Sequence, residues 1–382
     1  MRTTLVAIGL VLLAGSLPAL DTLNVRCVGR CATPSEAYGV AVNGGYAYVA
    51  DLDSGLVVVS VSDPANPCEV GRAGTQSRSY GVAVSGSYAY LAAADSGLIV
   101  VGIADPAHPA VVGRCNTPGW AGGVAANGDY AYVADYDSGL RVISVVDRAH
   151  PTEVARYTTG FPVSSVAVVG SYVHIADGID GVQVVSVADP RNPVRVGSCN
   201  FLPTAALSVA VSGDYAYATT HGRGLYVLSI SDSTTLTKVG RYGDYRWAWG
   251  TAVSGNLAWV AADEDGLRVI SVADPANPVE VGYYDKSSWA NGVTAAGDYI
   301  YLAYGREGLL ICQVYGYGVA EGVHPPAAGR PVATIGRRLP PGVRAFDAMG
   351  RLVLRPRAGL YFLREGESQS GTQPVRRFLV VE

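Results

Sequence analysis

The sequence predicts an all-β protein: a seven-bladed β-propeller with four-stranded blades, followed by a small β-sandwich domain. One sign is a glycine that recurs seven times, 42 or 43 residues apart, at Gly44, Gly86, Gly128, Gly170, Gly213, Gly255 and Gly297. A second is an aspartate with the same spacing, at Asp63, Asp105, Asp147, Asp189, Asp232 and Asp274. A period of roughly 40–45 residues is typical of four-stranded propeller blades.

Each repeat resolves into four short apolar runs. In the second repeat the runs begin at positions 82, 88, 98 and 111, and they are rich in Val, Ile and Tyr. Gly, Pro, Asp and Ser separate the runs, which is the pattern of strands joined by tight turns. The runs are apolar on both faces, as expected of a sheet that packs between two neighbouring sheets. They lack helical periodicity, which excludes a helical solenoid.

The ring is predicted to close with a strand from the N-terminal end of the chain. The seventh repeat has runs near 300 and 310 but lacks a fourth run. Residues 28–31, Val-Gly-Arg-Cys, match the fourth run of the second repeat at 112–115, an offset of 84 residues or two periods. Residues 22–316 therefore form the predicted propeller, in which the N-terminal strand covers an otherwise open sheet edge.

The repeats resemble the LVIVD repeat family. The resemblance rests on Gly-Leu-Arg-Val-Ile-Ser-Val at 139–145 and 266–272, and on Asp-Pro-Ala-Asn-Pro at 63–67 and 274–278. Members of that family are bacterial and archaeal propeller-like proteins, mostly secreted or attached to the cell surface. The resemblance implies a fold and does not imply an activity.

Residues 1–19 predict a secretory signal peptide. Arg2 provides a positive start, residues 5–13 form an apolar segment, and small residues follow at 14–16, which is the order expected of such a peptide. A membrane anchor is the alternative, but the apolar run is shorter than the roughly 20 residues that a span needs. We therefore expect a mature protein without a membrane span that is secreted or held at the cell surface.

The chain contains six cysteines: Cys27, Cys31, Cys68, Cys115, Cys199 and Cys312. Cys31, Cys115 and Cys199 occupy equivalent repeat positions on different blades, so they should lie too far apart to pair with one another. Cys27 on the closing strand and Cys312 on the adjacent strand could form a disulfide in an exported protein. Buried free thiols are the alternative, because a register different by one residue would place the two on opposite faces.

The composition and motifs argue against several classes of function. The net charge is −4, from 28 basic and 32 acidic residues, and this balance does not predict a nucleic-acid partner. The turns at 51–55 and 135–139 begin like a calcium loop but lack its other acidic ligands, so hairpin turns are favoured. His174 replaces a strand tyrosine and should be a packed strand residue. No catalytic constellation is recognisable, so no catalytic residue, metal or cofactor is predicted.

The loops that join each fourth strand to the next repeat vary in sequence, and all should open on one face of the ring, where binding residues tend to lie. Two of them, at 241–249 and 283–290, are dense in the aromatic and basic residues typical of binding hot spots. The predicted ligand-binding residues are Tyr242, Tyr245, Arg246, Trp249, Tyr284 and Lys286. We expect Tyr245, Arg246 and Trp249 to be the more exposed. Trp247 and Trp289, which share a repeat position with Trp120, should be mainly buried.

A linker at 317–330 precedes a basic C-terminal domain at 331–382. From position 325 onward the chain has ten arginines and four acidic residues. This domain resembles the C-terminal sorting domain of the type IX secretion system in a turn with Asp347, Gly350 and Arg351 and in a strand with Gly359 and Tyr361. The resemblance implies a β-sandwich that addresses the protein across the outer membrane. A small accessory β-domain is the alternative.

Two functions follow as hypotheses. The first is an exported, non-enzymatic and monomeric binding platform, whose partner is an unknown extracellular protein or glycan and whose C-terminal domain contacts the secretion machinery. The second is an extracellular hydrolase or lyase with its site in the propeller channel.

Overall fold

The computed structural model describes residues 22–232, 235–285 and 288–315, together with four strands between 343 and 380. The chain divides into two compact units, Met1–Val319 and Ala320–Glu382. The predicted signal peptide at 1–19 and the linker at 317–330 lie outside the described residues. Within the described part every regular element is a strand, and there is no helix that could cross a membrane.

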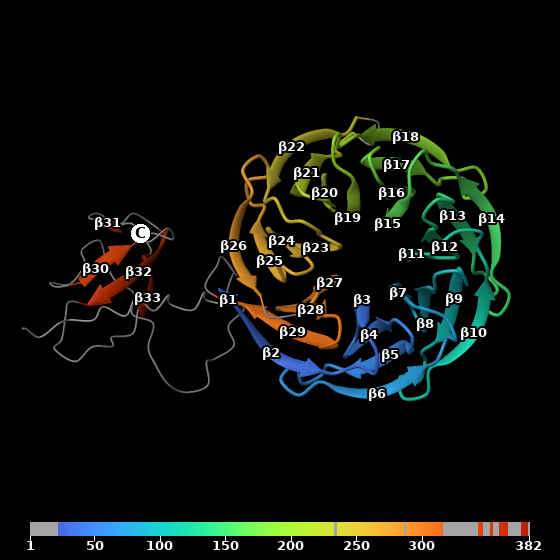
Figure 1. Ribbon diagram of the computed structural model, residues 1–382, viewed down its shortest axis with the longest axis horizontal. Helices are drawn as coiled ribbons and strands as arrows, with labels where there is room; N and C mark the ends of the chain where they lie inside the picture. Colours follow the sequence, from blue (N-terminus) through green and yellow to red (C-terminus); the bar gives the residue numbers. More distant parts are fainter. Residues whose placement is uncertain are drawn as a thin grey trace, which may run out of the picture. The chain divides into compact units, whose positions relative to one another are not determined.

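The first unit is a ring of seven four-stranded antiparallel blades (Figure 1). Blade 1 contains β3 (Ala37–Asn43), β4 (Tyr46–Asp51), β5 (Gly55–Ser60) and β6 (Cys68–Ala73). Blade 2 contains β7 (Gly81–Ser85), β8 (Tyr88–Ala92), β9 (Leu98–Gly102) and β10 (Ala110–Cys115). Blade 3 contains β11 (Gly123–Asn127), β12 (Tyr130–Ala134), β13 (Leu140–Ser144) and β14 (Thr152–Tyr157). Blade 4 contains β15 (Val163–Val169), β16 (Tyr172–Asp177), β17 (Val182–Ser186) and β18 (Val194–Cys199).

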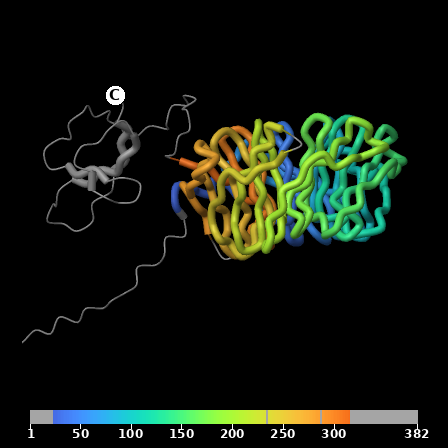
Figure 2. The backbone as a smooth tube through the Cα atoms, turned by 90° about the horizontal axis from the view of Figure 1, so that it is seen from above, coloured from blue at the N-terminus to red at the C-terminus, as the bar shows by residue number. Residues whose placement is uncertain are grey.

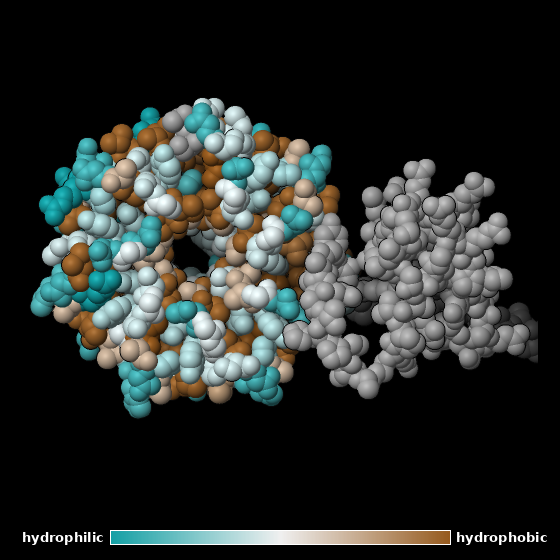
Figure 3. Space-filling model, turned by 180° about the vertical axis from the view of Figure 1, so that it is seen from behind, coloured by the Kyte–Doolittle hydropathy of each residue, from teal (hydrophilic) through white to brown (hydrophobic). Residues whose placement is uncertain are grey.

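Blade 5 contains β19 (Ala206–Ser212), β20 (Tyr215–Thr220), β21 (Gly224–Ser229) and β22 (Thr237–Tyr242). Blade 6 contains β23 (Gly250–Ser254), β24 (Leu257–Ala261), β25 (Leu267–Ser271) and β26 (Val279–Tyr284). Blade 7 contains β27 (Gly292–Ala296), β28 (Tyr299–Ala303), β29 (Leu309–Val314) and β2 (Val25–Cys31). The first strands of the seven blades are the innermost and together surround the centre of the ring (Figure 1). All strands run from one face of the ring toward the other (Figure 2). A space-filling view shows an opening at the centre that side chains do not fill (Figure 3).

The predicted closure of the ring is confirmed. Strand β2 pairs antiparallel with β29, with Gly29 opposite Ile311, and becomes the outer strand of blade 7. The sequence analysis missed a second contact of the N-terminal segment, because β1 (Thr22–Leu23) pairs with β26 as a fifth strand of blade 6. The chain passes from blade 6 to blade 7 at Asn24, whose Nδ2 donates a hydrogen bond to the Val281 carbonyl at 2.6 Å. The N-terminal segment therefore joins two blades.

The core lies between blades. Each of seven hydrophobic clusters draws its side chains mainly from two adjacent blades, as when Tyr90 and Leu98 of blade 2 pack with Ile143 of blade 3. The second strand of a blade carries one large buried residue at an equivalent position in each repeat: Tyr48, Tyr90, Tyr132, His174, Tyr217, Trp259 and Tyr301. His174 is 4% exposed, which confirms it as a packed strand residue. Burial on both faces explains why the runs are apolar rather than alternating.

The recurring glycine of the outer strand allows neighbouring blades to approach closely. A Cβ at Gly113 would collide with the carbonyl oxygen of Arg148, in the turn after the third strand of blade 3. Gly29, Gly71 and Gly240 face the equivalent turn of the next blade in the same way. The turns that begin at the recurring aspartate are thus contacts between blades. Asp63 stabilises its own turn by accepting hydrogen bonds from the Ala65 N–H and the Asn66 side chain.

The described strands of the second unit form one antiparallel sheet, in the order β31 (Leu352–Val353), β30 (Val343–Phe346), β32 (Gly359–Glu365) and β33 (Arg376–Val380). Gly359 and Tyr361 of the predicted sorting motif belong to β32. Asp347, Gly350 and Arg351 lie outside the described residues, as does any second sheet of the predicted sandwich.

Candidate functional site

The first strand of every blade begins at the same face of the ring, and one residue per blade stands there beside the central opening. We call these residues the channel mouth: Tyr38, Tyr80, Gly122, Ser164, Leu207, Trp249 and Asn291. Neighbouring members contact one another or each other's backbone. The Tyr38 and Tyr80 rings are 4.9 Å apart, Ser164 Oγ donates to the Leu207 carbonyl at 2.7 Å, and Asn291 Nδ2 donates to the Ala37 carbonyl at 2.9 Å. These contacts join Tyr38 to Tyr80 and Ser164 to Leu207, and they tie Asn291 to the backbone that precedes Tyr38.

Aromatic residues gather at two places, each made of members of the channel mouth and residues next to it. At one place the Tyr80 ring lies between Tyr38 and Trp120, with the Trp120 ring centroid 5.5 Å away. At the other place the Trp247 and Trp249 rings stack nearly parallel at 4.9 Å. The Trp247 ring also packs against the His221 ring, and their centroids are 4.1 Å apart. Aromatic pairs in these arrangements stabilise one another and leave flat apolar faces for a further ring.

Two tryptophans of this face are well exposed. Trp249 is 42% exposed, as predicted. The prediction for Trp289 was wrong, since it is 46% exposed, and Trp247 is only partly buried. The cause is local: the alanine after each repeated tryptophan, such as Ala248 or Ala290, is fully buried. Because side chains alternate in extended backbone, the residues on either side of that alanine turn toward the channel mouth.

Tyr245 and Tyr284, two of the predicted binding residues, are interior residues. Tyr245 is 9% exposed, and its hydroxyl donates a hydrogen bond to Glu280 at 3.0 Å. The guanidinium of Arg268 lies 5.8 Å from its ring. Burial, followed by the charge of Glu280, raises the pKa of Tyr245 far above its usual range. The expectation of an exposed Tyr245 was wrong, because the loop turns this ring into the core between blades 5 and 6.

The structure describes three of the four other residues predicted to bind a ligand. Tyr284 is buried beside Tyr304, with ring centroids 6.3 Å apart. Tyr242 is half-buried and packs against the core between blades 5 and 6, while Arg246 is exposed. Lys286 lies outside the described residues. Of the six predicted binding residues, the structure thus places Arg246 and Trp249 at the accessible part of this face.

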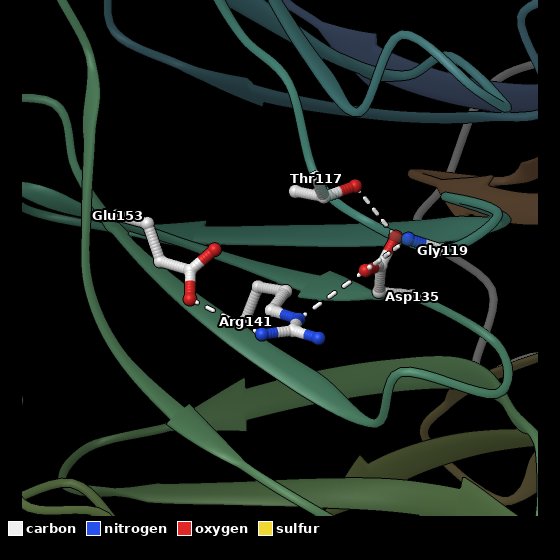
Figure 4. Close-up of polar contacts among 5 residues, drawn as sticks. All are labelled: Thr117, Gly119, Asp135, Arg141 and Glu153. Atoms are coloured by element: carbon white, nitrogen blue, oxygen red, sulfur yellow. Dashed lines mark hydrogen bonds and ion pairs between the residues drawn. The ribbon is translucent and has the colours of Figure 1, made fainter.

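Buried carboxylates hold the loops that lead to the channel mouth, and the sequence analysis did not anticipate them. Asp135, which directly follows β12 in blade 3, is fully buried. It accepts hydrogen bonds from Thr117 Oγ1 at 2.6 Å, the Gly119 N–H at 3.0 Å and Arg141 Nε at 3.2 Å (Figure 4). Arg141 in turn pairs with Glu153 at 3.2 Å. Burial raises the pKa of Asp135, and its hydrogen-bond donors oppose this rise.

Asp51 and Asp177 occupy the same repeat position as Asp135. Asp51 accepts a hydrogen bond from the Ser35 N–H at 2.9 Å. Asp177 accepts hydrogen bonds from the Thr159 side chain and the Phe161 N–H of the incoming loop, and one from the Gln183 amide of β17. Burial and the neighbouring Asp180 raise the pKa of Asp177 to about 6. In this way three blades fix the incoming loop with a carboxylate. The signal in the sequence was an acidic residue recurring just before the Ser-Gly or Asp-Gly turn.

Two ion pairs lie on the loops next to the channel mouth. Arg306 Nε lies 2.8 Å from Glu36, and Arg78 Nε lies 3.4 Å from Asp53. Trp249 hydrogen-bonds the Asp263 carboxylate, whose pKa is raised mainly by burial. Within the described residues, His, Cys, Asp and Glu side chains form no group of three or more that could hold a metal ion. This face is equipped for stacking and hydrogen bonding.

Comparison with known proteins agrees with this architecture. The family model described as the LVIVD repeat matches seven segments: residues 34–75, 78–117, 118–159, 162–201, 204–244, 246–286 and 289–314. No match was found among curated protein sequences.

Similar solved structures include two WD40 proteins and one designed protein. The WD40 β-propeller domain of Doa1 is 10% identical, with a TM-score of 0.63 over 77% of this chain and 98% of that chain. The WD40 repeats of RRP9 are 13% identical, with a TM-score of 0.61 over 76% and 97%. The computationally designed Ika8 protein is 10% identical, with a TM-score of 0.55 over 74% and 98%. At these identities the likeness is one of fold. Because the family model covers most of the chain, repeat by repeat, this protein belongs to the LVIVD repeat family.

Proposed function

We propose that this protein is an exported, non-enzymatic binding platform whose channel mouth is the contact surface. The single observation that carries the proposal is the gathering of aromatic residues at and next to the channel mouth, where Trp249 and Trp289 are more than two-fifths exposed. Large exposed aromatic side chains at one place on a rigid scaffold are typical of binding hot spots. Aromatic, small and amide side chains at the mouth support binding rather than a hydrolase or lyase reaction.

A carbohydrate chain is the ligand that this surface favours. The face of an aromatic ring carries partial negative charge, and the C–H groups on one side of a sugar ring are weakly positive and match it. Trp249, which is 42% exposed, can offer the ring face that is turned away from Trp247. Nearby polar groups such as Asp263 and His221 offer hydrogen bonds to hydroxyl groups. The two nearby ion pairs are each neutral overall, and the exposed Arg246 adds one cationic group to this face.

The ends of the chain support the proposal that the protein works outside the cell. Residues 1–19 have the pattern of a signal peptide, and the arginine-rich segment from 325 resembles a type IX sorting domain. The sheet formed by β30 to β33 is compatible with that resemblance. In this proposal the C-terminal domain, a β-sandwich, directs the protein to the cell surface or the medium, and the propeller binds.

An array of glycans and peptides probed with the purified chain tests the function. We expect selective binding to a group of related glycans and loss of that binding in Trp249→Ala. Tyr172→Ala is the matched control, because Tyr172 is 38% exposed at the opposite end of its hairpin. If the protein binds only peptides on the array, its ligand is a protein and not a glycan. Equal loss in both variants, or binding that Trp249→Ala leaves intact, would contradict a role for the channel mouth.

A further inference from the structure

The place where the ring closes carries a pair of cysteines that no other blade has. Cys27 of β2 lies directly opposite Cys312 of β29 in the strand register. At the other six blades the same position pairs Val59 with Glu69, Val101 with Val111, Ile143 with Glu153, Val185 with Arg195, Leu228 with Lys238 and Ile270 with Glu280. In those blades the two strands are joined by a short turn. Only in blade 7 do they come from opposite ends of the propeller sequence.

The hydrogen-bond pattern brings these two side chains as close as a sheet allows. The Tyr315 N–H donates to the Asn24 carbonyl at 3.0 Å, so residues 24 and 315 form a hydrogen-bonded pair. Pairs alternate along an antiparallel ladder, and the register continues from Val25 opposite Val314 to Cys27 opposite Cys312. The cysteines therefore form a non-hydrogen-bonded pair, in which Cα atoms are about 4.5 Å apart. Disulfides span Cα distances of roughly 4.4–6.8 Å.

We propose that Cys27 and Cys312 form a disulfide that locks β2 onto β29 and so fixes the closure of the ring. Both are thiols in the structure, with Cys312 buried and Cys27 half-buried. The other four cysteines have different surroundings. Cys115 and Cys199 share the repeat position of Cys31, on different blades, and Cys68 is exposed at the start of β6.

The chemistry of the pair suits oxidation by a small-molecule disulfide. A hydrogen bond from Cys312 lowers the pKa of Cys27, which favours the Cys27 thiolate, the form that attacks a disulfide. The Cys27 thiolate attacks the small disulfide, forms a mixed disulfide and releases one thiol of the oxidant. Cys312 then gives up its proton and attacks the Cys27 sulfur, releasing the second thiol. Two electrons and two protons have passed from the cysteines to the oxidant.

The experiment treats the purified, reduced chain with oxidised glutathione and counts free thiols after unfolding. The count should fall from six to four, with an intact mass lower by two hydrogens and no retained glutathione. Digestion without reductant should yield one linked peptide containing Cys27 and Cys312. The oxidised protein should melt roughly 5 °C or more above the reduced protein, since the bridge closes a very long loop.

Matched variants keep the test decisive. Cys115→Ser should still lose two thiols on oxidation, whereas Cys27→Ser should lose none and should show no gain in melting temperature. If Cys27→Ser folds poorly, the peptide map of the unaltered protein still shows whether Cys27 and Cys312 are linked. The proposal is overturned if all six thiols persist in the presence of oxidised glutathione. It is also overturned if the bridge joins Cys31 to Cys68, whose thiol is near enough to affect the pKa of Cys31.

Discussion

The two ends of the first hairpin in every blade differ in one instructive way. At the turn end the second strand opens with Tyr46, Tyr88, Tyr130, Tyr172, Tyr215, Leu257 and Tyr299, a tyrosine in all blades but one. At the other end the channel mouth reads Tyr, Tyr, Gly, Ser, Leu, Trp and Asn. Both sets have the same backbone role in each repeat, so the fold does not require the variation at the mouth. The constant end serves the scaffold, and the variable end is where a specific ligand can be recognised.

Removal of residues 20–34 is the strongest test of the claim that the N-terminal strand closes the propeller ring. This deletion takes away β2 and the contact of β1 with blade 6. It exposes the edge of β29 and part of the core that contains Cys312 and Val314. We expect the largest effect of all the changes considered, a protein that aggregates or melts more than about 10 °C lower. An unchanged melting temperature would contradict closure by the N-terminal strand.

Asp135→Ala tests whether the buried carboxylate holds its loop. The variant leaves the Arg141 side chain, 6% exposed, with only Glu153 as a partner. Breaking a buried pair from one side costs about 3–5 kcal/mol. Blade 2 has Ala93 and Ile99 at the two equivalent positions. The double variant Asp135→Ala/Arg141→Ile copies that pair and should recover much of the stability in denaturant unfolding. Equal losses in the single and double variants would count against the network.

Tyr245→Ala separates packing from binding in the loop at 241–249. We expect a loss of about 3 kcal/mol in the free energy of unfolding, because a buried ring and its bond to Glu280 are removed. Tyr245→Phe keeps the ring and should lose only about 1.5 kcal/mol, at the low end of the range for a hydrogen bond to a charged group, because Glu280 is partly exposed. A surface role for Tyr245 would instead appear as unchanged stability with weakened ligand binding.

His174→Tyr gives a pH-dependent effect. Burial lowers the pKa of His174 to about 4, so the folded protein keeps it neutral while the unfolded chain takes up a proton below about pH 6.5. Acidification from pH 7 to 5 should therefore cost the protein about 2 kcal/mol of stability through this residue. The tyrosine variant, which copies Tyr132, should lack this loss. Asp177 has the opposite effect on stability, because its raised pKa makes the folded protein less stable as the pH rises through about 6. Both proteins contain Asp177, so its effect cancels when they are compared.

The scaffold was predictable because a fixed period applies the same physical constraint seven times. The equivalence of Gly29 and Gly113 alone located the closing strand. Strand β1 was missed because Thr22 and Leu23 have no counterpart in the other repeats. Burial of Tyr245 was missed for a related reason: it belongs to an irregular loop whose direction depends on a partner, Glu280, that is distant in sequence. Exposure of Trp289 could have been inferred from the alternation that buries Ala290.

Tryptophan fluorescence during a titration with an array-selected glycan tests the central claim most directly. Four of the five tryptophans, Trp120, Trp247, Trp249 and Trp289, lie at or next to the channel mouth, and only Trp259 lies inside a blade interface. Saturable binding should change the emission, and the change should persist in Trp259→Phe and in Tyr172→Ala. In Trp249→Ala the affinity should fall roughly thirty-fold, as expected for a hot spot worth about 2 kcal/mol. A glycan that binds without altering the emission, or equally well in Trp249→Ala, would contradict binding at the channel mouth.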